Sequence, residues 1–503
     1  MKTCDVLIVG AGPTGLVLAL WLTRLGVPVR IIDKAALPGT TSRALAVHAR
    51  TLELYSQLDL TDAVLANGHK VPAANLWVEG EKKARLDFGD AGQEHTPYPF
   101  LHIFPQDEHE KLLIARLEDL GVRVQRQSEL LGFADDGEGV IADIKTQNGT
   151  ETIQCSYLAG CDGARSKTRE ILGTGFPGGT YAQIFYVADV EASGPPMNGE
   201  LHADLDEADF LAVFPLKGEG RARLIGAVRG ERAAHAETLQ FSDVADRAIT
   251  NLKVKVERVN WFSTYRVHHR VANHFRKGRA FLLGDAAHIH SPAGGQGMNT
   301  GIGDAINLAW KLKWVLDGRA SPTLLSSYEE ERITFARTLV ETTDRGFSFA
   351  SNDGPLADFV RTKIAPIVLP AAAYFHAFRE LAFRTVSQTL INYRGMALAE
   401  GKAGKVSGGD RLPWIADSRN YDSLSQMIWQ VHVYGEVRAG IHDWCEQNKV
   451  HLTRFVWDKT YGEAGLKQDA VYLIRPDSYV AMADEKALPQ NLENYFASRK
   501  LTP

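Results

Sequence analysis

The sequence predicts an α/β protein with a Rossmann-like domain, a mostly antiparallel β-sheet inserted into that domain, a helical segment and a smaller C-terminal domain. Three features predict this arrangement. Residues 5–33 have the strand, glycine turn, helix and strand of a βαβ unit, and residues 281–315 combine a strand, a glycine-rich turn and a helix. Between Gly178 and Lys277 the chain changes to alternating β-type runs separated by Gly and Pro, which favours an inserted antiparallel sheet.

The N-terminal unit has the glycine spacing of a dinucleotide-binding turn. The apolar strand DVLIV precedes Gly10, Gly12 and Gly15. The first glycine makes the tight turn, the second lets a pyrophosphate approach, and the third allows close packing of helix on strand. The next strand, VRII, ends at Asp33, where an acid binds a ribose diol. This half fits FAD and NAD equally, and a βαβ unit without any nucleotide remains an alternative.

The second unit favours FAD. The apolar run FLL ends at Gly284, which leaves Asp285 at the carboxyl edge of a strand, where an acid suits a polyol hydroxyl. Glycines 294, 295 and 297 let the backbone approach a flat ring closely. Helical spacing begins at about Gly301, so free N–H groups at the helix start would stabilise the negative charge of a reduced flavin. An ordinary strand, turn and helix packed around glycines is the alternative.

Composition narrows the class of protein. The chain has 503 residues, 45% of them hydrophobic, and a net charge of −5, so we expect several domains and no electrostatic attraction to nucleic acid. No apolar stretch is long enough for a membrane span, and a strand that starts at residue 5 leaves no room for a signal peptide. Four cysteines form neither CxxC nor a zinc spacing, which predicts buried, reduced thiols in a cytoplasmic protein: Cys4, Cys155, Cys161 and Cys445.

We expect four parts along the chain. Residues 1–176 and 278–350 would form a discontinuous FAD-binding domain, and residues 177–277 a sheet that holds substrate. Residues 351–403 would be a helical segment, and residues 404–503 a small α/β domain. The run GKAGKVSGGDRLP at 401–413 resembles a linker because of its Gly and Lys content. A helix in HEKLLIARLEDLG and a strand in VRVQ are expected to belong to the first domain.

Three motifs resemble those of the class A flavoprotein aromatic hydroxylases, the superfamily of p-hydroxybenzoate hydroxylase and phenol hydroxylase. They are GAGPTG at 10–15, CDGARS at 161–166 and GDAAHIHSPAGGQGMNTGIGDAINLAWKL at 284–312. The C-terminal hundred residues resemble the thioredoxin-like domain of phenol and polyketide hydroxylases, chiefly in YLIRPDSYVAM at 472–482. Without CxxC this domain cannot perform dithiol chemistry, so we expect it to be structural or to support a homodimer.

The resemblance implies a cofactor site. In the family, Asp285 binds the ribityl chain, Asp33 the adenosine ribose, and Asp162 both FAD and a transient pyridine nucleotide. The residues implied to line the isoalloxazine are Pro292, Gly295, Gln296, Gly297, Met298 and Asn299. Arg43 and Gln106 are placed near the dinucleotide. The remaining predicted cofactor contacts are Gly10, Gly12, Pro13, Thr14, Gly15, Lys34, Leu130 and Gly163. FAD would be bound tightly without a covalent bond, with NADPH or NADH as a transient co-substrate.

The resemblance also implies a reaction. NAD(P)H reduces FAD, O2 adds to give a flavin hydroperoxide, and an electron-rich aromatic ring takes its distal oxygen. Phenol hydroxylases carry an aspartate near the substrate where this chain has Leu45, which argues against simple phenol. The candidate catalytic residues are Arg43, His48, Tyr186 and Tyr265, although a histidine or tyrosine is more often a packing residue.

We therefore expect an FAD-dependent monooxygenase that hydroxylates a phenolic or polyketide-type aromatic. Epoxidation or Baeyer-Villiger oxidation of a secondary metabolite is an alternative, as is a flavin-binding sensor or partner module without turnover. The HxH of His288 and His290 has no carboxylate or cysteine partner at a metal-binding spacing, so no metal is expected. The small aromatic substrate is the only partner that we expect besides a second copy of the chain.

Overall fold

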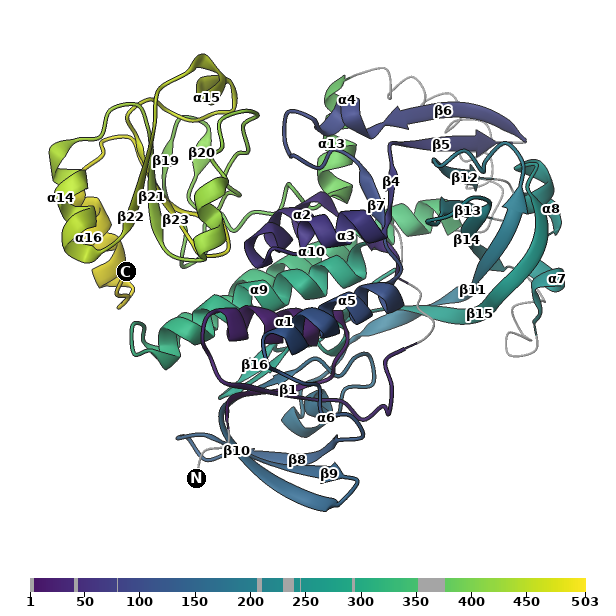
Figure 1. Cartoon of the computed structure of the whole chain (residues 1–503), viewed down its shortest axis with the longest axis horizontal. Coiled ribbons are helices and arrows are strands. Elements are labelled where there is room, and N and C mark those ends of the chain that lie inside the picture. Colours follow the sequence, from purple (N-terminus) through teal and green to yellow (C-terminus); the bar gives the residue numbers. More distant parts are fainter. Residues whose placement is uncertain are drawn as a thin grey trace.

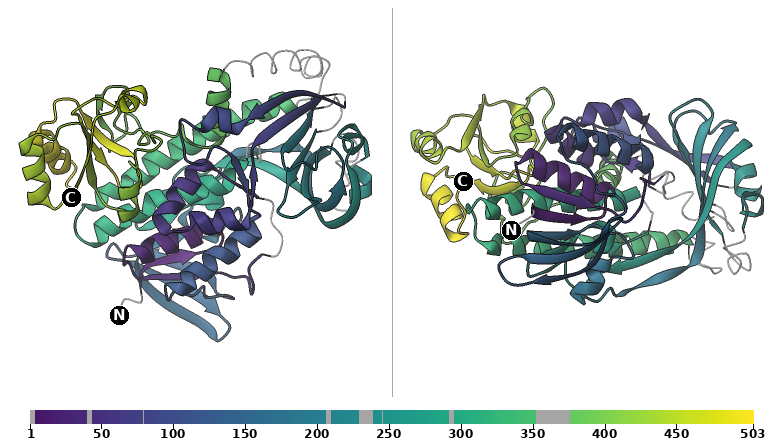
Figure 2. Two further views of the ribbon diagram at one scale, coloured as in Figure 1. Left: turned by 45° about the horizontal axis from the view of Figure 1, so that its top comes forward. Right: turned by 60° about the horizontal axis from the view of Figure 1, so that its bottom comes forward.

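The structure is a computed structural model that describes residues 4–39, 44–78, 80–205, 210–228, 239–244, 246–291, 295–351 and 376–503. A central domain contains the N-terminal strands and the long helices. An antiparallel sheet adjoins it on one side, and the C-terminal domain lies against it on the other (Figure 1). The two further views show the same order, with the central domain between the other two (Figure 2). No helix in the described ranges combines the length and the apolar character needed to cross a membrane.

The central sheet brings four chain segments to one edge. Its order is β16 (Arg276–Lys277), β17 (Ala280–Leu282), β10 (Gly149–Gly160), β1 (Cys4–Val9) and β2 (Val29–Ile32), and β9 (Val140–Thr146) and β8 (Glu129–Asp135) extend β10. Strand β1 is parallel to β2 and β10, and β10 is parallel to β17. The carboxyl ends of these four strands therefore meet, which is where open α/β sheets bind ligands.

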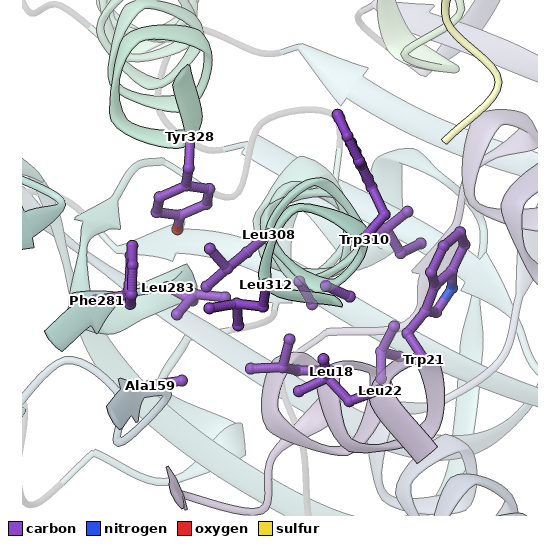
Figure 3. Packing of buried hydrophobic residues seen from close by; sticks show 14 of the residues in the cluster. Leu18, Trp21, Leu22, Ala159, Phe281, Leu283, Leu308, Trp310, Leu312 and Tyr328 are labelled. Atoms are coloured by element: carbon purple, nitrogen blue, oxygen red, sulfur yellow. The ribbon is translucent and has the colours of Figure 1, made fainter. Parts of the chain in front are cut away.

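Two helices from distant parts of the sequence cover this sheet. Helix α1 (Pro13–Arg24) and helix α9 (Gln296–Leu316) lie side by side, and their buried Leu18, Leu22, Leu308 and Leu312 meet between them (Figure 3). On the other side of α9, Tyr328 of α10 (Ser326–Ser351) donates its hydroxyl to the carbonyl of Leu282 at 2.7 Å. Strand β17, which precedes the second glycine turn, is thereby fixed against α9 and α10.

Helix α9 begins earlier than the sequence indicated. It starts at Gln296, whereas the apolar spacing predicted a start near Gly301. The cause is Gly295, which caps the helix with a left-handed φ of 64° and so allows the chain to turn directly into it. The polar residues between 296 and 300 therefore belong to the first helical turn, although they carry no apolar period.

The second sheet joins strands from three parts of the chain. Its order is β18 (His288–Ile289), β15 (Lys255–Val271), β11 (Gly178–Ser193), β14 (Arg221–Val228), β13 (Phe210–Pro215), β12 (Leu201–Leu205), β5 (Ala73–Val78) and β6 (Glu81–Asp87). All neighbouring strands of this path in the described ranges are antiparallel except β12 and β5. The inserted antiparallel sheet is confirmed as part of the fold, and it recruits β5, β6 and β18 from outside residues 177–277. The domain boundaries stay a prediction.

The C-terminal domain is a mixed sheet flanked by helices α14 (Ala439–Asn448) and α16 (Pro489–Ser498). The sheet order is β20 (Val406–Ser407), β19 (Glu400–Ala403), β24 (Val480–Asp484), β23 (Val471–Ile474), β21 (Gln430–Tyr434) and β22 (His451–Phe455). The expected linker at 401–413 is wrong, because β19 and β20 belong to this sheet. A Cβ on Gly401 would lie 2.3 Å from the carbonyl oxygen of Ala483, so this glycine serves close strand packing instead of flexibility.

The remaining elements are shorter or peripheral. The expected strand at 122–125 is wrong apart from one bridge between Ile32 and Gln125, whereas the helix before it is present as α5 (Gln106–Asp119). All four cysteines are buried, and none of them forms a disulfide. The other helices are α2 (Ala49–Tyr55), α3 (Thr61–Asn67), α4 (Phe88–Gly92), α6 (Lys167–Leu172), α7 (Phe241–Val244), α8 (Asp246–Asn251), α13 (His376–Val386) and α15 (Lys459–Glu463). The 3₁₀ helices are η1 (Ser56–Leu58), η3 (Gly284–Ala286), η5 (Pro322–Leu325) and η7 (Asp422–Gln426), and β3 (Ala46–Val47), β7 (Leu101–Ile103) and β4 (His69–Val71) form a small sheet.

Candidate active site

The first glycine turn has the shape of a nucleotide cradle. Gly10 has a φ of 104°, and a Cβ there would lie 2.3 Å from the carbonyl oxygen of Cys161. A Cβ on Gly15 would lie 2.0 Å from the carbonyl oxygen of Gly10, so both positions need glycine. A Cβ on Gly12, the N-cap of α1, would meet nothing within 4 Å. Open space at a helix N-terminus with free N–H groups suits the pyrophosphate of FAD.

A carboxylate and a cation lie beside this turn. Asp33 accepts hydrogen bonds from the backbone N–H groups of Ala11 and Ala35, each at 2.8 Å, and its side chain is 18% exposed. Arg126 Nη1 lies 3.8 Å from Asp33 Oδ1, and its Nη2 is buried with no hydrogen-bond partner in the described residues. A ribose diol and the adjoining phosphates would supply what these groups lack. No periodic pattern in the sequence indicated a role for Arg126.

The second glycine turn lies directly against the first. A Cβ on Gly284 would lie 2.7 Å from Thr14 Oγ1, and one on Gly301 would lie 2.3 Å from the same atom. Thr14 is thus enclosed by the strand end and by α9, which brings the two motifs together in one site. Asp285 follows on the exposed side of η3. A carboxylate at this position suits the ribityl hydroxyls of FAD.

A buried acid on α9 holds the second turn in place. Asp304 Oδ2 accepts from Gly284 N at 2.9 Å and from His288 Nε2 at 2.7 Å, and its Oδ1 accepts from Arg332 Nε at 2.6 Å. Burial alone would raise the pKa of Asp304, but Arg332 and His288 keep it below its ordinary value. Arg332 also donates to the carbonyl of Thr300 at 3.0 Å. Sequence reasoning missed this pair, for which the only signal was an acid inside an apolar helical run.

The two histidines of HxH are used for structure. His288 donates to Asp304, and His290 Nδ1 donates to the carbonyl of Ser291 at 2.8 Å. Burial and the neighbouring His288 lower the pKa of His290 to about 4, so this ring is neutral at physiological pH. Within the described ranges, His, Cys, Asp and Glu side chains form no group of three or more that could hold a metal ion.

Asn299, in the first turn of α9, links the helix start to the segment before α2. Its Oδ1 accepts from His48 N at 2.9 Å and from Thr51 Oγ1 at 2.8 Å. Its Nδ2 donates to the carbonyls of Ala46 at 2.9 Å and Gly295 at 3.0 Å. His48 is 1% exposed and donates Nε2–H to the carbonyl of Gly295 at 3.0 Å. This bond commits the Nε2 proton of His48 to the glycine turn.

The other predicted cofactor residues lie at or near the same edge. Gln106 is the first residue of α5, and its backbone N–H donates to the carbonyl of Ala44 at 3.0 Å. Lys34 is exposed, Pro13, Leu130 and Gln296 are buried, and Gly297 and Met298 are half-buried. Arg43 and Pro292 lie outside the described residues.

Asp162 has a local structural task. It accepts from Ser166 Oγ at 2.5 Å, and from the backbone N–H and the hydroxyl of Thr168 at 2.9 and 3.0 Å. The carboxylate therefore fixes the start of α6. Next to it, Gly163 has a φ of 76°, and a Cβ there would meet nothing within 4 Å. The DG turn thus presents open backbone beside the first glycine turn.

The two candidate tyrosines lie on opposite faces of the antiparallel sheet. Tyr186, 1% exposed, belongs to one cluster with Leu224 and with Val244 of α7. Helix α7 lies on the side of the sheet that faces away from the central domain (Figure 1). Tyr265 pairs with Phe185 on the other face, with ring centroids 5.9 Å apart. The structure brings only Tyr265 to the face that looks toward the glycine turns.

Comparisons with known proteins agree with this site. Residues 3–343 match the family described as "FAD binding domain". The chain is 37% identical over 396 residues to a 6-methylpretetramide 4-monooxygenase of Streptomyces rimosus, covering 78% of this chain and 69% of that protein. It is 31% identical over 501 residues to a flavin-dependent monooxygenase of Mycobacteroides abscessus, covering 95% and 97%. An anhydrotetracycline hydroxylase structure from Streptomyces rimosus superposes with a TM-score of 0.78 at 28% identity, over 100% and 99% of the two chains.

The sequence match covers both glycine turns, the DG turn and the buried acid of α9, which are the parts that form one cradle in the structure. The structural likeness extends over the antiparallel sheet and the C-terminal domain as well. The cofactor is FAD, and NAD(P)H and O2 are the co-substrates that this family uses. The chain therefore belongs to the FAD-binding-domain family of flavin-dependent aromatic hydroxylases, and it is an FAD-dependent monooxygenase.

Proposed function

We propose that this enzyme hydroxylates a phenolic aromatic of polyketide type, bound between the antiparallel sheet and the loop at 44–48. When bound, FAD supplies a two-electron reduction by NAD(P)H and the transfer of one oxygen atom from O2 to an electron-rich ring. Asp33 and Arg126 would hold the adenosine end of FAD, and Asp285 the ribityl chain. Gly295 to Asn299 would lie along the ring, where the N-terminus of α9 stabilises negative charge.

The apolar character of the sheet face carries the proposal for the substrate. Phe185 and Tyr265 pack together with Ala227 and Val267 on this face. On the same face, Phe214 and Ile225 are packed with Leu45 and Ala46, and the carbonyl of Ala46 accepts a hydrogen bond from Asn299. An apolar sheet face of this kind favours a flat, largely apolar ligand over a small charged one. Two similar proteins are named for 6-methylpretetramide and anhydrotetracycline, which supports a fused aromatic system.

The side chains near this sheet face limit how a phenol could be activated. His48 donates its Nε2 proton to Gly295, and Leu45 is 5% exposed inside the apolar cluster. Tyr265 is then the predicted catalytic residue whose hydroxyl belongs to the substrate face, and we propose it as the group that orients the substrate hydroxyl. Tyr186 is not proposed for this role, because its side chain lies on the opposite face.

Two cations make the side of η3 a suitable place for the transient pyridine nucleotide. Arg169 donates to the carbonyl of Ala286 at 2.9 Å, one residue after Asp285. Burial lowers the pKa of Arg169, and the nearby charge of Arg270 lowers it further. Arg270 Nε is buried without a hydrogen-bond partner in the described residues. We propose that the phosphates of NADPH or NADH lie against this pair. The role predicted for Arg43 stays a prediction.

Substrate is expected to control reduction of the flavin. Because the described residues contain no second dinucleotide-binding unit, we propose that the nicotinamide binds transiently beside FAD. Oxidation of NADPH or NADH should therefore be slow alone and rise at least about tenfold with a true substrate, a change of about 1.4 kcal/mol in the barrier. The test screens fused phenolic aromatics for stimulation of NAD(P)H oxidation and examines the products by mass spectrometry for the gain of one oxygen.

The outcomes of this screen are distinct. Hydroxylation adds one oxygen to an intact aromatic ring, whereas Baeyer-Villiger oxidation yields an ester or lactone and epoxidation an oxirane. An unreactive mimic that stimulates NAD(P)H oxidation should release hydrogen peroxide in place of product. A flavin-bound protein that oxidises neither nucleotide with any aromatic would favour the sensor alternative over the proposed enzyme. The proposal places the protein in the cytoplasm and leaves a homodimer as an expectation.

A further inference from the structure

The loop between β23 and β24 is buried against the central domain. Its Arg475, 1% exposed, donates to Glu331 of α10 at 2.6 and 3.0 Å and to Asp477 at 2.6 and 2.9 Å. Glu331 also accepts from Lys311 Nζ of α9 at 2.8 Å, and Asp477 accepts from Trp310 Nε1 at 3.0 Å. The residues RPDS, which lie in the stretch YLIRPDSYVAM, therefore make an intramolecular contact with α9 and α10.

The same loop is bonded to α2 through one side chain. Arg50, whose side chain is 3% exposed, donates Nη2 to the carbonyl of Asp477 at 3.0 Å and to Ser478 Oγ at 2.8 Å. Its Nη1 pairs with Glu53 of the same helix at 3.0 Å. The guanidinium also lies 4.9 Å from the ring centroid of Tyr479. The C-terminal domain therefore fixes the N-terminal half of α2 by two hydrogen bonds from one guanidinium nitrogen of Arg50.

That half of α2 is also the part bonded to the helix start at Asn299. Thr51, next to Arg50, and His48, two residues before it, both donate to Asn299 Oδ1. Asn299 in turn donates to the carbonyl of Gly295, the cap of α9. Residues of all three partners line one small cavity of about 20 Å³, among them Arg50, Thr51, Asn299, Asp477 and Tyr479. The path from the C-terminal loop to the cap of α9 thus runs through a single turn of α2.

We propose that Arg50 is a positioning residue. Through it, the C-terminal domain holds Asn299 and the N-terminus of α9 in the correct position beside the flavin ring. The C-terminal domain therefore helps to position the flavin site, although it contributes no redox group. The inference rests on the proposed placement of the flavin ring along Gly295 to Asn299. A helix terminus stabilises a charge only within its first turn, so a small displacement of this turn changes how well the reduced flavin is stabilised.

The molecule offers a matched control. Gln57 in η1, 2% exposed, donates Nε2 to the carbonyls of Leu424 at 2.7 Å and Pro476 at 2.9 Å. It therefore makes the same kind of double contact with the C-terminal domain as Arg50 does. Both of these side-chain hydrogen bonds go to that domain, whereas the turn that contains Arg50 is bonded to Asn299. Loss of either contact weakens docking, but only loss of Arg50 should disturb the flavin site.

The experiment compares the holoenzymes of Arg50→Met, Arg50→Lys and Gln57→Met with the wild type. The readouts are the melting temperature, the Kd for FAD from quenching of its fluorescence, and the midpoint potential of the bound flavin. We expect Arg50→Met to bind FAD on the order of tenfold more weakly and to make the potential more negative. Arg50→Lys, which keeps a donor, should recover part of both changes. Gln57→Met should lower the melting temperature while leaving the Kd within about twofold of the wild type.

Two results would overturn the proposal. One is an Arg50→Met protein with wild-type Kd and potential, and the other is a Gln57→Met protein that changes both as strongly as Arg50→Met does. If Arg50→Met fails to fold, Ser478→Ala decides, because it removes one acceptor of the same contact and should weaken FAD binding in the same direction. Failure of the proposed function would appear differently, as a wild-type protein that binds FAD but oxidises neither NADPH nor NADH with any aromatic.

Discussion

Replacing Glu331 with leucine is expected to cost about 3–5 kcal/mol of stability, because it leaves charges buried without their acidic partner. Glu331, Lys311 and Arg475 are each at most 1% exposed, and Glu331 is bonded to both cations. Burial would raise the pKa of Glu331, but Arg475 and Lys311 hold it below the ordinary value, so the carboxylate is ionised. Its loss leaves Lys311 with only Asn307 as a hydrogen-bond partner in the described residues. The measurement is urea unfolding followed by tryptophan fluorescence.

Helix α9 supplies the control for this prediction. Lys313 pairs with Asp317 at 2.9 Å, with side chains that are 24% and 34% exposed. Lys313→Ala should change stability by less than about 1 kcal/mol, since water screens the pair. If Glu331→Leu unfolds at the same urea concentration as Lys313→Ala, then the ion cluster of Glu331, Lys311 and Arg475 does not hold the C-terminal domain to α9 and α10.

Replacing Asp285 with alanine is expected to weaken FAD binding about ten- to a hundredfold. A carboxylate that accepts hydrogen bonds from ribityl hydroxyls contributes about 1.5–3 kcal/mol for each bond. Asp285 lies on the exposed side of η3, and the turn itself is fixed by Gly284 N and Asp304, so the substitution should leave the turn in place. Titration of the apoprotein with FAD, followed by fluorescence quenching, measures the change.

Asp62 provides the comparison for Asp285. It is exposed on α3 and lies outside both glycine turns, so Asp62→Ala should bind FAD like the wild type. An Asp285→Ala protein with an unaltered melting temperature and an FAD Kd within twofold of the wild type would remove Asp285 from the site. The ribityl chain would then have to bind elsewhere along the same sheet edge, away from η3.

Local patterns predicted the parts of the site whose signals lie within a few residues of one another. The first glycine turn, the acid at the end of β2 and the strand before Gly284 each depend on short spacings, and all three meet at one sheet edge. Periodicity and short motif spacings are properties of one segment, so a single sequence carries them. The alternation of β11 likewise implied two faces.

Features that depend on distant partners were not predictable. Nothing local to β11 says that Tyr186 faces α7 while Phe185 and Tyr265 face the glycine turns. The early start of α9 depends on Gly295 and on the bonds of Asn299 to residues 46–51. Arg332 acquires its role only because the fold places it against Asp304. The glycines at 401–413 indicate a flexible linker when the sequence is considered alone. In the structure, strand β24 lies against them.

The two glycine turns are expected to form one site for FAD. The most direct measurement is the flavin content of the purified protein, from its visible absorbance and from the flavin released on denaturation. We expect a yellow protein with about one FAD per chain, or an apoprotein that takes up one FAD per chain when titrated. A folded wild-type protein that is colourless and binds no added FAD would contradict this account.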